Sequence, residues 1–319
     1  MAIKRVAFLT SGGDAPGMNA AIRAVVRSGL ILGMEMFGVY EGYKGLVEGK
    51  IEQFTSKNVS HILDRGGTII GSARLPEFTE KVVRDLAVKQ LKKYFIDALI
   101  VIGGDGTFKG GQKLSEMGIK VIGIPATIDN DVNSTDSTIG FSTALNTVVD
   151  AIDKLRDTSE SHHRCSILET MGRDCGDLAI YAGVCGGAEY VITKETGFDK
   201  KAMLDSLRKK KLKGRRHAII LTTENAVDVH KLAKEIEDYS GYETRATVLG
   251  YVQRGGKPTP EDRVLASRFG NYAIELLQQD ISGVIVGISH NDMIHMTFDE
   301  SIKCPFVKSQ LFDLIEKIR

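Results

Sequence analysis

The stretch Ala98-Leu99-Ile100-Val101-Ile102-Gly103-Gly104-Asp105-Gly106-Thr107 is a continuous apolar run that ends in a glycine-rich acidic turn. Such a run has the length of a strand buried on both faces, which is typical of a parallel sheet. The glycines let the backbone approach a polyphosphate, and Asp105 can hold Mg²⁺ directly or through water. The alternative interpretation is an ordinary turn that contains an acid.

The same alternation of short apolar runs and longer helical patterns continues along the chain. Buried strands alternating with helices predict an α/β protein with parallel sheets covered on both faces. In such sheets ligands bind beyond the carboxyl ends of the strands, which is where this sequence places its Gly and Asp residues. Helices are expected over residues 18–32, 81–93 and 138–156, and strands over 5–10, 36–40, 98–102, 120–124, 166–168, 190–192, 218–221 and 284–288.

Composition limits the possible partners and the compartment. The 319 residues suit two domains, and a net charge of +1 provides no overall field for nucleic acid or an anionic membrane. No apolar run approaches the ~20 residues that span a bilayer, and the N-terminus leads directly into a strand. A cytosolic protein without nucleic-acid or membrane partners is expected. The four cysteines form no C-x-x-C pair and are expected to be free thiols: Cys165, Cys175, Cys185 and Cys304.

Two further loops follow predicted strands. Ser11-Gly12-Gly13-Asp14-Ala15-Pro16-Gly17 precedes a helix and can cradle a phosphate at the helix N-terminus, or can be a tight turn. In Pro125-Ala126-Thr127-Ile128-Asp129-Asn130-Asp131, the carboxylates of Asp129 and Asp131 would share a face if the backbone is extended. One can then accept a hydroxyl proton while the other helps to hold a metal. The alternative is an Asx-type turn that caps a helix starting near Thr138.

Phosphoryl transfer needs cations around the phosphate oxygens, because it depends on positioning and charge. Four arginines lie beside glycines or at strand ends, where a surface role is less typical: Arg74, Arg173, Arg245 and Arg254.

Together these segments resemble the bacterial ATP-dependent 6-phosphofructokinases over nearly the whole chain, with a match that weakens after about Gly287. The segments that carry the resemblance are LTSGGDAPGMNAAIRAVVR, RGGTIIGSARLPEF, VIGGDGT, TIDND, TIGFSTALNTVVDAIDKLRDT, MGRDCGD, VLGYVQRGG and DRVLASR.

The resemblance implies two doubly wound α/β domains with mostly parallel central sheets and an active site in the cleft between them. Residues 1–140 with 252–303 would bind ATP, and residues 141–251 with 304–319 would bind the sugar phosphate. The implied reaction phosphorylates the 1-hydroxyl of fructose 6-phosphate, giving fructose 1,6-bisphosphate and ADP.

The resemblance also assigns roles to individual residues. Asp129 would be the base, Thr127 and Arg173 would stabilise the transferring phosphoryl group, and Asp105 and Asp131 would organise Mg²⁺. The implied ATP-binding residues are Gly13, Tyr43, Arg74, Leu75, Gly104, Asp105, Gly106 and Thr107. The implied sugar-phosphate residues are Thr127, Asp129, Arg164, Met171, Gly172, Arg173, Glu224, Arg245, Tyr251 and Arg254.

Subunit assembly and regulation follow from the same resemblance. Arg164 and Arg245 would come from a neighbouring subunit, so a homotetramer would form part of the active site. An effector site for nucleoside diphosphate and phosphoenolpyruvate would use Arg23, Arg27, Arg156, Glu189, Lys213 and Arg215. Arg23 and Arg27 are four apart, so they share a helix face.

Four positions bear on how this chain differs from its relatives. Pyrophosphate-using relatives place an acid where this chain has Gly106 and a lysine where it has Ala126, so Gly106 favours ATP and Ala126 permits it. Tyr251 replaces the usual histidine and cannot become cationic near neutral pH, so weaker or less pH-sensitive sugar-phosphate binding is expected. His61 stands where an acid commonly helps to bind effector.

Three alternative functions remain open from the sequence. They are a pyrophosphate-dependent phosphofructokinase, an enzyme like the NAD or lipid kinases that share Gly-Gly-Asp-Gly-Thr, and a catalytically silent nucleotide-sensing subunit.

Overall fold

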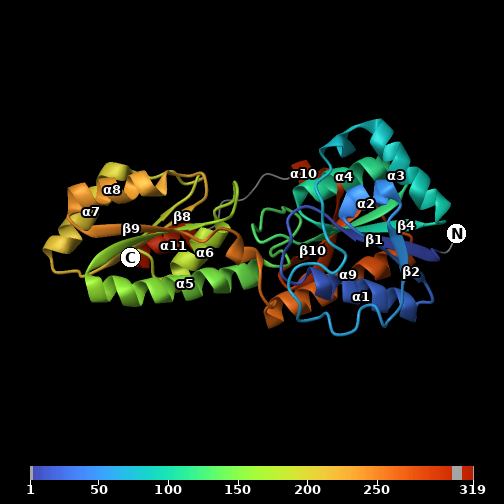
Figure 1. Cartoon of the computed structure of the whole chain (residues 1–319), viewed down its shortest axis with the longest axis horizontal. Coiled ribbons are helices and arrows are strands. Elements are labelled where there is room, and N and C mark those ends of the chain that lie inside the picture. The colour runs from blue at the N-terminus through green and yellow to red at the C-terminus, as the bar shows by residue number, and fades with distance from the viewer. Residues whose placement is uncertain (1–2, 304–310, 319) are drawn as a thin grey trace. The chain divides into compact units, whose positions relative to one another are not determined.

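The computed structural model describes residues 3–303 and 311–318, which divide into two compact units (Figure 1). The larger unit lies within Met1–Thr143 and Arg254–Phe306, and the smaller within Ala144–Gln253 and Val307–Arg319. Each unit has its own sheet.

The larger unit contains a seven-stranded sheet in the order β11-β10-β5-β4-β1-β2-β3. Its edge strands β3 and β11 pair antiparallel with their neighbours, and the other pairings are parallel. Its elements are β1 (Arg5–Thr10), α1 (Met18–Ile31), β2 (Glu35–Val39), α2 (Gly42–Glu48), β3 (Ile51–Phe54), the 3₁₀ helix η1 (Pro76–Thr79), α3 (Lys81–Lys93), β4 (Ala98–Gly103), α4 (Asp105–Glu116), β5 (Lys120–Pro125), α9 (Pro260–Gln278), β10 (Val284–Ser289), β11 (Asp292–Thr297) and α10 (Phe298–Lys303).

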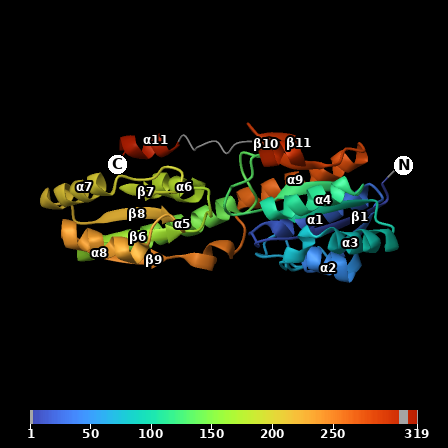
Figure 2. The same cartoon turned by 90° about the horizontal axis from the view of Figure 1, so that it is seen from above.

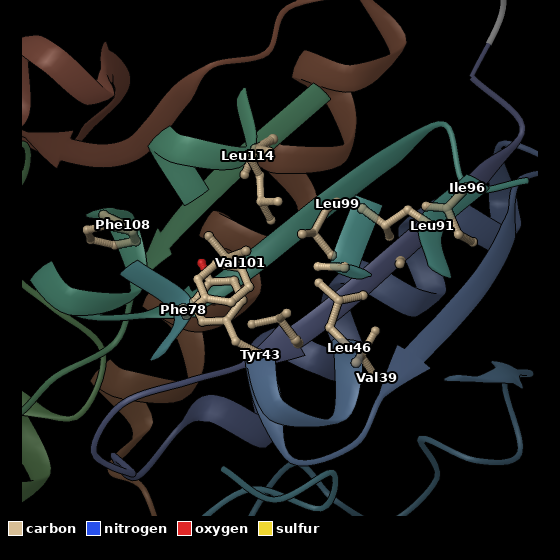
Figure 3. Close-up of a cluster of buried hydrophobic side chains, with 14 of the residues drawn as sticks. Val39, Tyr43, Leu46, Phe78, Leu91, Ile96, Leu99, Val101, Phe108 and Leu114 are labelled. Atoms are coloured by element: carbon tan, nitrogen blue, oxygen red, sulfur yellow. The ribbon is translucent and has the colours of Figure 1, made fainter. Parts of the chain in front are cut away.

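Helices cover both faces of this sheet because its central strands are apolar on both faces. On one face, residues of α2, α3 and α4 pack with Leu99 and Val101 of β4 in a buried cluster, as Figure 3 shows. On the opposite face α1 and α9 pack so closely that a Cβ at Gly270 would lie 2.6 Å from the Cβ of Ala24. The two layers are visible on either side of the sheet in Figure 1.

The chain reverses its winding direction between β1 and β4. After β1 it proceeds through α1 to β2, whereas after β4 it proceeds through α4 to β5 on the other side of β1. Adjacent strands whose following helices leave to opposite faces form the topological switch point of a doubly wound sheet. The loops after β1 and β4 therefore border the crevice where ligands bind in such folds.

The smaller unit contains four parallel strands in the order β7-β8-β6-β9. Residues of α7 and α8 pack on one face with Ile167 and Ile220, and α5, α6 and α11 lie on the other (Figures 1 and 2). The remaining elements are α5 (Phe141–His162), β6 (Arg164–Thr170), α6 (Asp177–Gly186), β7 (Tyr190–Ile192), α7 (Lys200–Leu212), β8 (Ala218–Thr223), α8 (Val229–Ser240), β9 (Glu243–Val248), the 3₁₀ helix η2 (Gly250–Arg254) and α11 (Leu311–Ile318).

Side chains define several helix starts. The Asp228 carboxylate accepts hydrogen bonds from the amides of His230 and Lys231 at the start of α8. Asp262, a buried residue of α9, accepts from the amides of Gly140 and Thr143, each at 2.8 Å, at the start of α5. Burial raises the pKa of the Asp262 carboxyl, and these hydrogen bonds act in the opposite direction.

The predicted α/β class and the mostly parallel sheets are confirmed. The predicted helix over 138–156 starts later, at Phe141, and extends to His162, because Thr138 takes part in the preceding loop. Three strands were missed: β3 and β11 are edge strands with exposed residues, and β9 carries mostly polar side chains.

Two other expectations concern cysteines and membranes. Cys165, Cys175 and Cys185 are free thiols, the first two buried, whereas Cys304 lies outside the described residues. Among the residues that the structure describes, no helix is both long and apolar enough to cross a membrane.

The contact between α1 and α9 predicts a strict requirement for glycine at position 270. A Cβ there would lie 2.9 Å from the Ala21 carbonyl oxygen and 3.0 Å from the Val25 nitrogen, so backbone would have to move. Gly270→Ala should lower the free energy of unfolding by about 1–3 kcal/mol, as overpacked cores do. Urea unfolding measures the change.

Val264, an exposed residue of the same helix, provides the control. Val264→Ala should shift stability by less than about 0.5 kcal/mol. A Gly270→Ala protein as stable as the unmodified chain would contradict the close packing.

Candidate active site

Three loops of the larger unit meet at the carboxyl ends of β1, β4 and β5. The Ser11 amide donates to the Ile102 carbonyl at 3.0 Å, and the Thr107 hydroxyl donates to the Ser11 carbonyl at 2.9 Å. The Ala126 amide donates to the Gly103 carbonyl at 2.9 Å. The structure thus brings together the three loops that the sequence singled out.

The Gly103–Gly106 turn is shaped by close backbone approach. A Cβ at Gly103 would lie 2.4 Å from both the Ser11 carbonyl oxygen and the Thr107 hydroxyl oxygen, so only glycine fits. Gly106, in contrast, has nothing within 4 Å of its Cβ position. Because it lies in the first turn of α4, this open space adjoins a helix N-terminus that favours anions.

The acidic loop after β5 is not extended, so the expected reason for Asp129 and Asp131 to share a face was wrong. Asn130 between them has φ 53°, in the left-handed region. Its side-chain oxygen accepts from the Thr138 amide at 3.0 Å, and the Thr138 hydroxyl donates to the Thr127 carbonyl at 2.6 Å. The alternative interpretation, an Asx-type anchor, therefore describes Asn130. Asp129 beside it is buried.

Asp105 and Asp131 could hold Mg²⁺. Asp105 is the first residue of α4, and its partly exposed carboxylate pairs with Lys109 at 2.6 Å. Within the described ranges, no three His, Cys, Asp or Glu residues cluster as a complete metal site. Mg²⁺ commonly binds one or two carboxylates and completes its shell with substrate phosphates and water.

Arg74 and Arg254 line one pocket of roughly 410 Å³ together with the first glycine loop. The Arg254 guanidinium lies over Gly13, with a nitrogen 3.1 Å from the Cβ position of that glycine. Gly13, which the resemblance implies for ATP, and Arg254, which it implies for the sugar phosphate, are thus neighbours. The other lining residues are Gly12, Asp14, Thr68, Ser72 and Ala73, of which Thr68, Ser72 and Ala73 were missed.

Tyr43 holds the first turn of α4 in place. Its hydroxyl donates to the Thr107 carbonyl at 2.6 Å, and its ring stacks on Phe78 with centroids 4.2 Å apart (Figure 3). Only 5% of the residue is exposed, and burial raises the pKa of its hydroxyl. Leu75 packs against the same cluster. Tyr43 therefore exposes little surface to a ligand.

In the smaller unit, the loop after β6 meets the residue after β8. The Arg173 amide donates to the Glu224 carboxylate at 3.1 Å, and the Met171 amide donates to the side-chain oxygen of Gln253 at 3.1 Å. Gly172 has φ 138°, and a Cβ there would lie 2.6 Å from the Cys175 carbonyl oxygen. Met171, Gly172, Arg173 and Glu224 are therefore brought together as expected. Gln253 was missed because it was read only as part of Val252–Gly256.

Arg164 and Arg245 lie at the other end of the same sheet. Arg164 begins β6, seven residues before Met171, so about 20 Å of strand separates them. Both arginines pair with Glu243, at 3.0 Å and 2.5 Å. Within one chain the structure does not join them to the Met171–Arg173 loop. Tyr251, on η2, is exposed.

The expected effector residues divide between the units. Arg23 and Arg27 share α1, where burial and then the charge of Arg27 lower the pKa of Arg23. In the smaller unit, Arg156 donates to the Gly186 carbonyl, and the Glu189 carboxylate accepts from the Ile219 amide at 2.7 Å. The other members of the set, Lys213 and Arg215, are exposed after α7. His61 is exposed in the larger unit and has φ 55°.

Comparisons with known proteins agree on one family. The phosphofructokinase family matches residues 5–277. The ATP-dependent 6-phosphofructokinase of Vibrio campbellii is 54% identical over 319 residues, covering 99% of both chains. A solved phosphofructokinase from Saccharomyces cerevisiae is 36% identical with a TM-score of 0.86; the match covers 94% of this chain but only 45% of the yeast chain.

A pyrophosphate-dependent phosphofructokinase from Nitrosospira multiformis shares the fold at a TM-score of 0.87, with 18% identity and coverage of 97% of this chain and 86% of that one. The fold therefore does not distinguish the phosphoryl donor, whereas the family match over residues 5–277 and the 54% identity establish the family. The chain belongs to the phosphofructokinase family.

Proposed function

We propose that this chain is an ATP-dependent 6-phosphofructokinase, which transfers the terminal phosphoryl group of ATP to the 1-hydroxyl of fructose 6-phosphate. The observation that carries the proposal is the meeting of two loops at the switch point. Ala126 of the acidic loop donates to Gly103 of the glycine loop, and the Cβ position of Gly104 lies 3.6 Å from the Thr127 Cβ. A phosphate-binding turn and a buried carboxylate that can serve as a base thus occupy one edge of the sheet.

In the proposed mechanism the larger unit supplies Thr127 and Asp129, and the smaller unit supplies Arg173. Asp129 accepts the proton of the sugar hydroxyl as that oxygen attacks the terminal phosphorus. Thr127 and Arg173 stabilise the transferring group, since charge stabilisation and positioning carry most of this chemistry. When bound, Mg²⁺ neutralises charge on the ATP phosphates, and Asp105 and Asp131 would hold it.

The other proposed binding residues divide into those for ATP and those for the sugar phosphate. Arg74, Gly13 and the first turn of α4 would hold ATP phosphates, because cations and helix N-termini both attract them. Met171, Gly172 and Glu224 would hold the sugar, and Arg254 its 6-phosphate. Arg164 and Arg245 would serve the active site of a neighbouring subunit, since in their own chain they lie at the opposite end of the strand.

ATP rather than pyrophosphate fits the surroundings of the two loops. The Cβ position of Gly106 has open space around it, and glycine brings no carboxylate of its own to that position. Ala126 is 1% exposed, and its methyl group brings no cation to the site.

We further infer a homotetramer in the cytosol. An effector site would use the two arginines of α1 and the four effector residues of the smaller unit. His61 in place of an acid makes the effector response weaker than in relatives that carry the acid.

The function is tested by supplying different donors and acceptors to the purified chain with Mg²⁺. Fructose 1,6-bisphosphate should form from fructose 6-phosphate and ATP, and not from pyrophosphate. NAD in place of the sugar phosphate should give no phosphorylated product. Turnover with pyrophosphate alone would overturn the assigned donor. A folded protein that turns over with neither ATP nor pyrophosphate would be a nucleotide-binding subunit without activity.

The proposed base is tested by Asp129→Asn, which keeps the shape of the side chain but cannot accept a proton. It should lower kcat by at least ~10²-fold with little change in ATP affinity, because general-base catalysis contributes roughly 10²–10⁴. Asp136→Asn is the control: this exposed residue of the same loop accepts from the His290 amide, which an amide oxygen can also do. A near-normal kcat for Asp129→Asn would remove the assigned role.

The exposed Tyr251 predicts a weak pH dependence of sugar-phosphate binding. Histidine gains a charge below its ordinary pKa of about 6.5, whereas tyrosine stays neutral there. Tyr251→His should therefore lower the KM for fructose 6-phosphate progressively as the pH falls from 8 to 6, relative to the unmodified enzyme. Parallel KM profiles for the two proteins over that range would show that position 251 does not contact the phosphate.

A further inference from the structure

The segment from Arg65 to Arg74 lines the site without forming a helix or strand. It supplies Thr68, Ser72, Ala73 and Arg74 to the pocket above Gly13. A few of its backbone groups bond other backbone, as the Ile70 carbonyl does with the Glu41 amide at 2.8 Å, and the rest depend on side chains or water. Which side chains hold this segment therefore decides where Arg74 lies.

One buried side chain holds the start of the segment with three hydrogen bonds. Asn19, the second residue of α1, is 1% exposed. Its amide nitrogen donates to the carbonyls of Arg65 at 3.0 Å and Gly66 at 3.1 Å. Its oxygen accepts from the Ile69 amide at 2.8 Å. The site needs two donated hydrogens and one acceptor, which an asparagine provides and an ionised aspartate cannot.

Further contacts fasten the rest of the segment to the first glycine loop. The Thr10 hydroxyl donates to the Gly71 carbonyl at 2.9 Å, and the Ser72 hydroxyl donates to the Gly12 carbonyl at 2.7 Å. Gly71 and Ser72 follow the residues that Asn19 holds. We therefore expect their hydrogen bonds to keep this geometry only while Arg65, Gly66 and Ile69 stay in place.

The same anchor reaches the second arginine loop. A Cβ at Gly66 would lie only 2.3 Å from the Gly256 carbonyl oxygen, so the two backbones are in direct contact. Gly256 is two residues after Arg254. Holding Gly66 thus supports the loops of both Arg74 and Arg254.

We propose that Asn19 is a positioning residue for phosphate binding, acting through the Arg65–Arg74 segment without touching substrate. The proposal rests on the proposed function for its kinetic consequence, because Arg74 is there a ligand of the ATP phosphates. Loss of the two donated bonds leaves the carbonyls of Arg65 and Gly66 without their side-chain partner, so this end of the segment is no longer fastened to α1.

The test compares Asn19→Asp with Val25→Ala. Asn19→Asp keeps the size and the acceptor oxygen and loses both donors. Val25 is a fully buried residue of the same helix, so Val25→Ala destabilises the unit without touching the segment. Asn19→Asp should raise the KM for ATP on the order of tenfold, with a smaller change in kcat. Val25→Ala should leave both constants close to those of the unmodified enzyme.

Limited trypsin digestion of the folded proteins gives a readout independent of activity. Cleavage after Arg65 and Arg74 should be faster in Asn19→Asp than in Val25→Ala, because the Arg65 carbonyl loses its hydrogen bond. If cleavage accelerates but the chain does not use ATP, the proposed function fails and the structural role stands. Equal cleavage in the two variants, or faster cleavage with an unchanged KM for ATP, would overturn the positioning role.

Asn19→Ala covers the possibility that the aspartate is not tolerated in the core. It brings no charge and should show the same rise in KM and in cleavage. If both Asn19 variants fail to fold while Val25→Ala folds, Asn19 acts in folding and the proposal is wrong.

Discussion

The parallel pairing of β1 with β4 is the constraint on which the site depends. These strands lie side by side although 87 residues lie between Thr10 and Ala98, and their following helices leave to opposite faces. The Thr107 hydroxyl then donates to the Ser11 carbonyl, joining the two glycine-rich loops. Because Gly103 cannot accept a Cβ, this approach of two backbones is possible only with the residue that the chain has there.

Buried side chains below the crevice keep these loops in place. Tyr43 links the α4 turn to Phe78 of η1, and Asn19 links α1 to the segment that carries Arg74. Both are almost fully buried and bond backbone groups with their polar atoms. The loops of the candidate site thus depend on groups whose own positions are determined by packing, which is how precise geometry is retained in loops.

Much of the fold and of the site was predictable from local patterns. The buried strand before Gly103 and the helix over Lys81–Lys93 follow from apolar periodicity, which survives in any tertiary context. The strands β3, β9 and β11 could not be predicted in this way, because exposed or edge strands lack a continuous apolar pattern. The roles of Asn19 and Gln253 could not be predicted either, because the sequence does not show whether an amide side chain is buried or exposed.

The sequence by itself determined the family, the α/β class and the identity of the chemical groups, because glycine-rich turns and paired acids after apolar strands are local and specific. Only the tertiary structure decided how those groups are held. It shows Asn130 in a left-handed conformation between the two aspartates, Arg254 over Gly13, and Arg164 at the far end of the strand from Met171. These relations depend on strand order, register and backbone contact between segments distant along the chain, which no local pattern encodes.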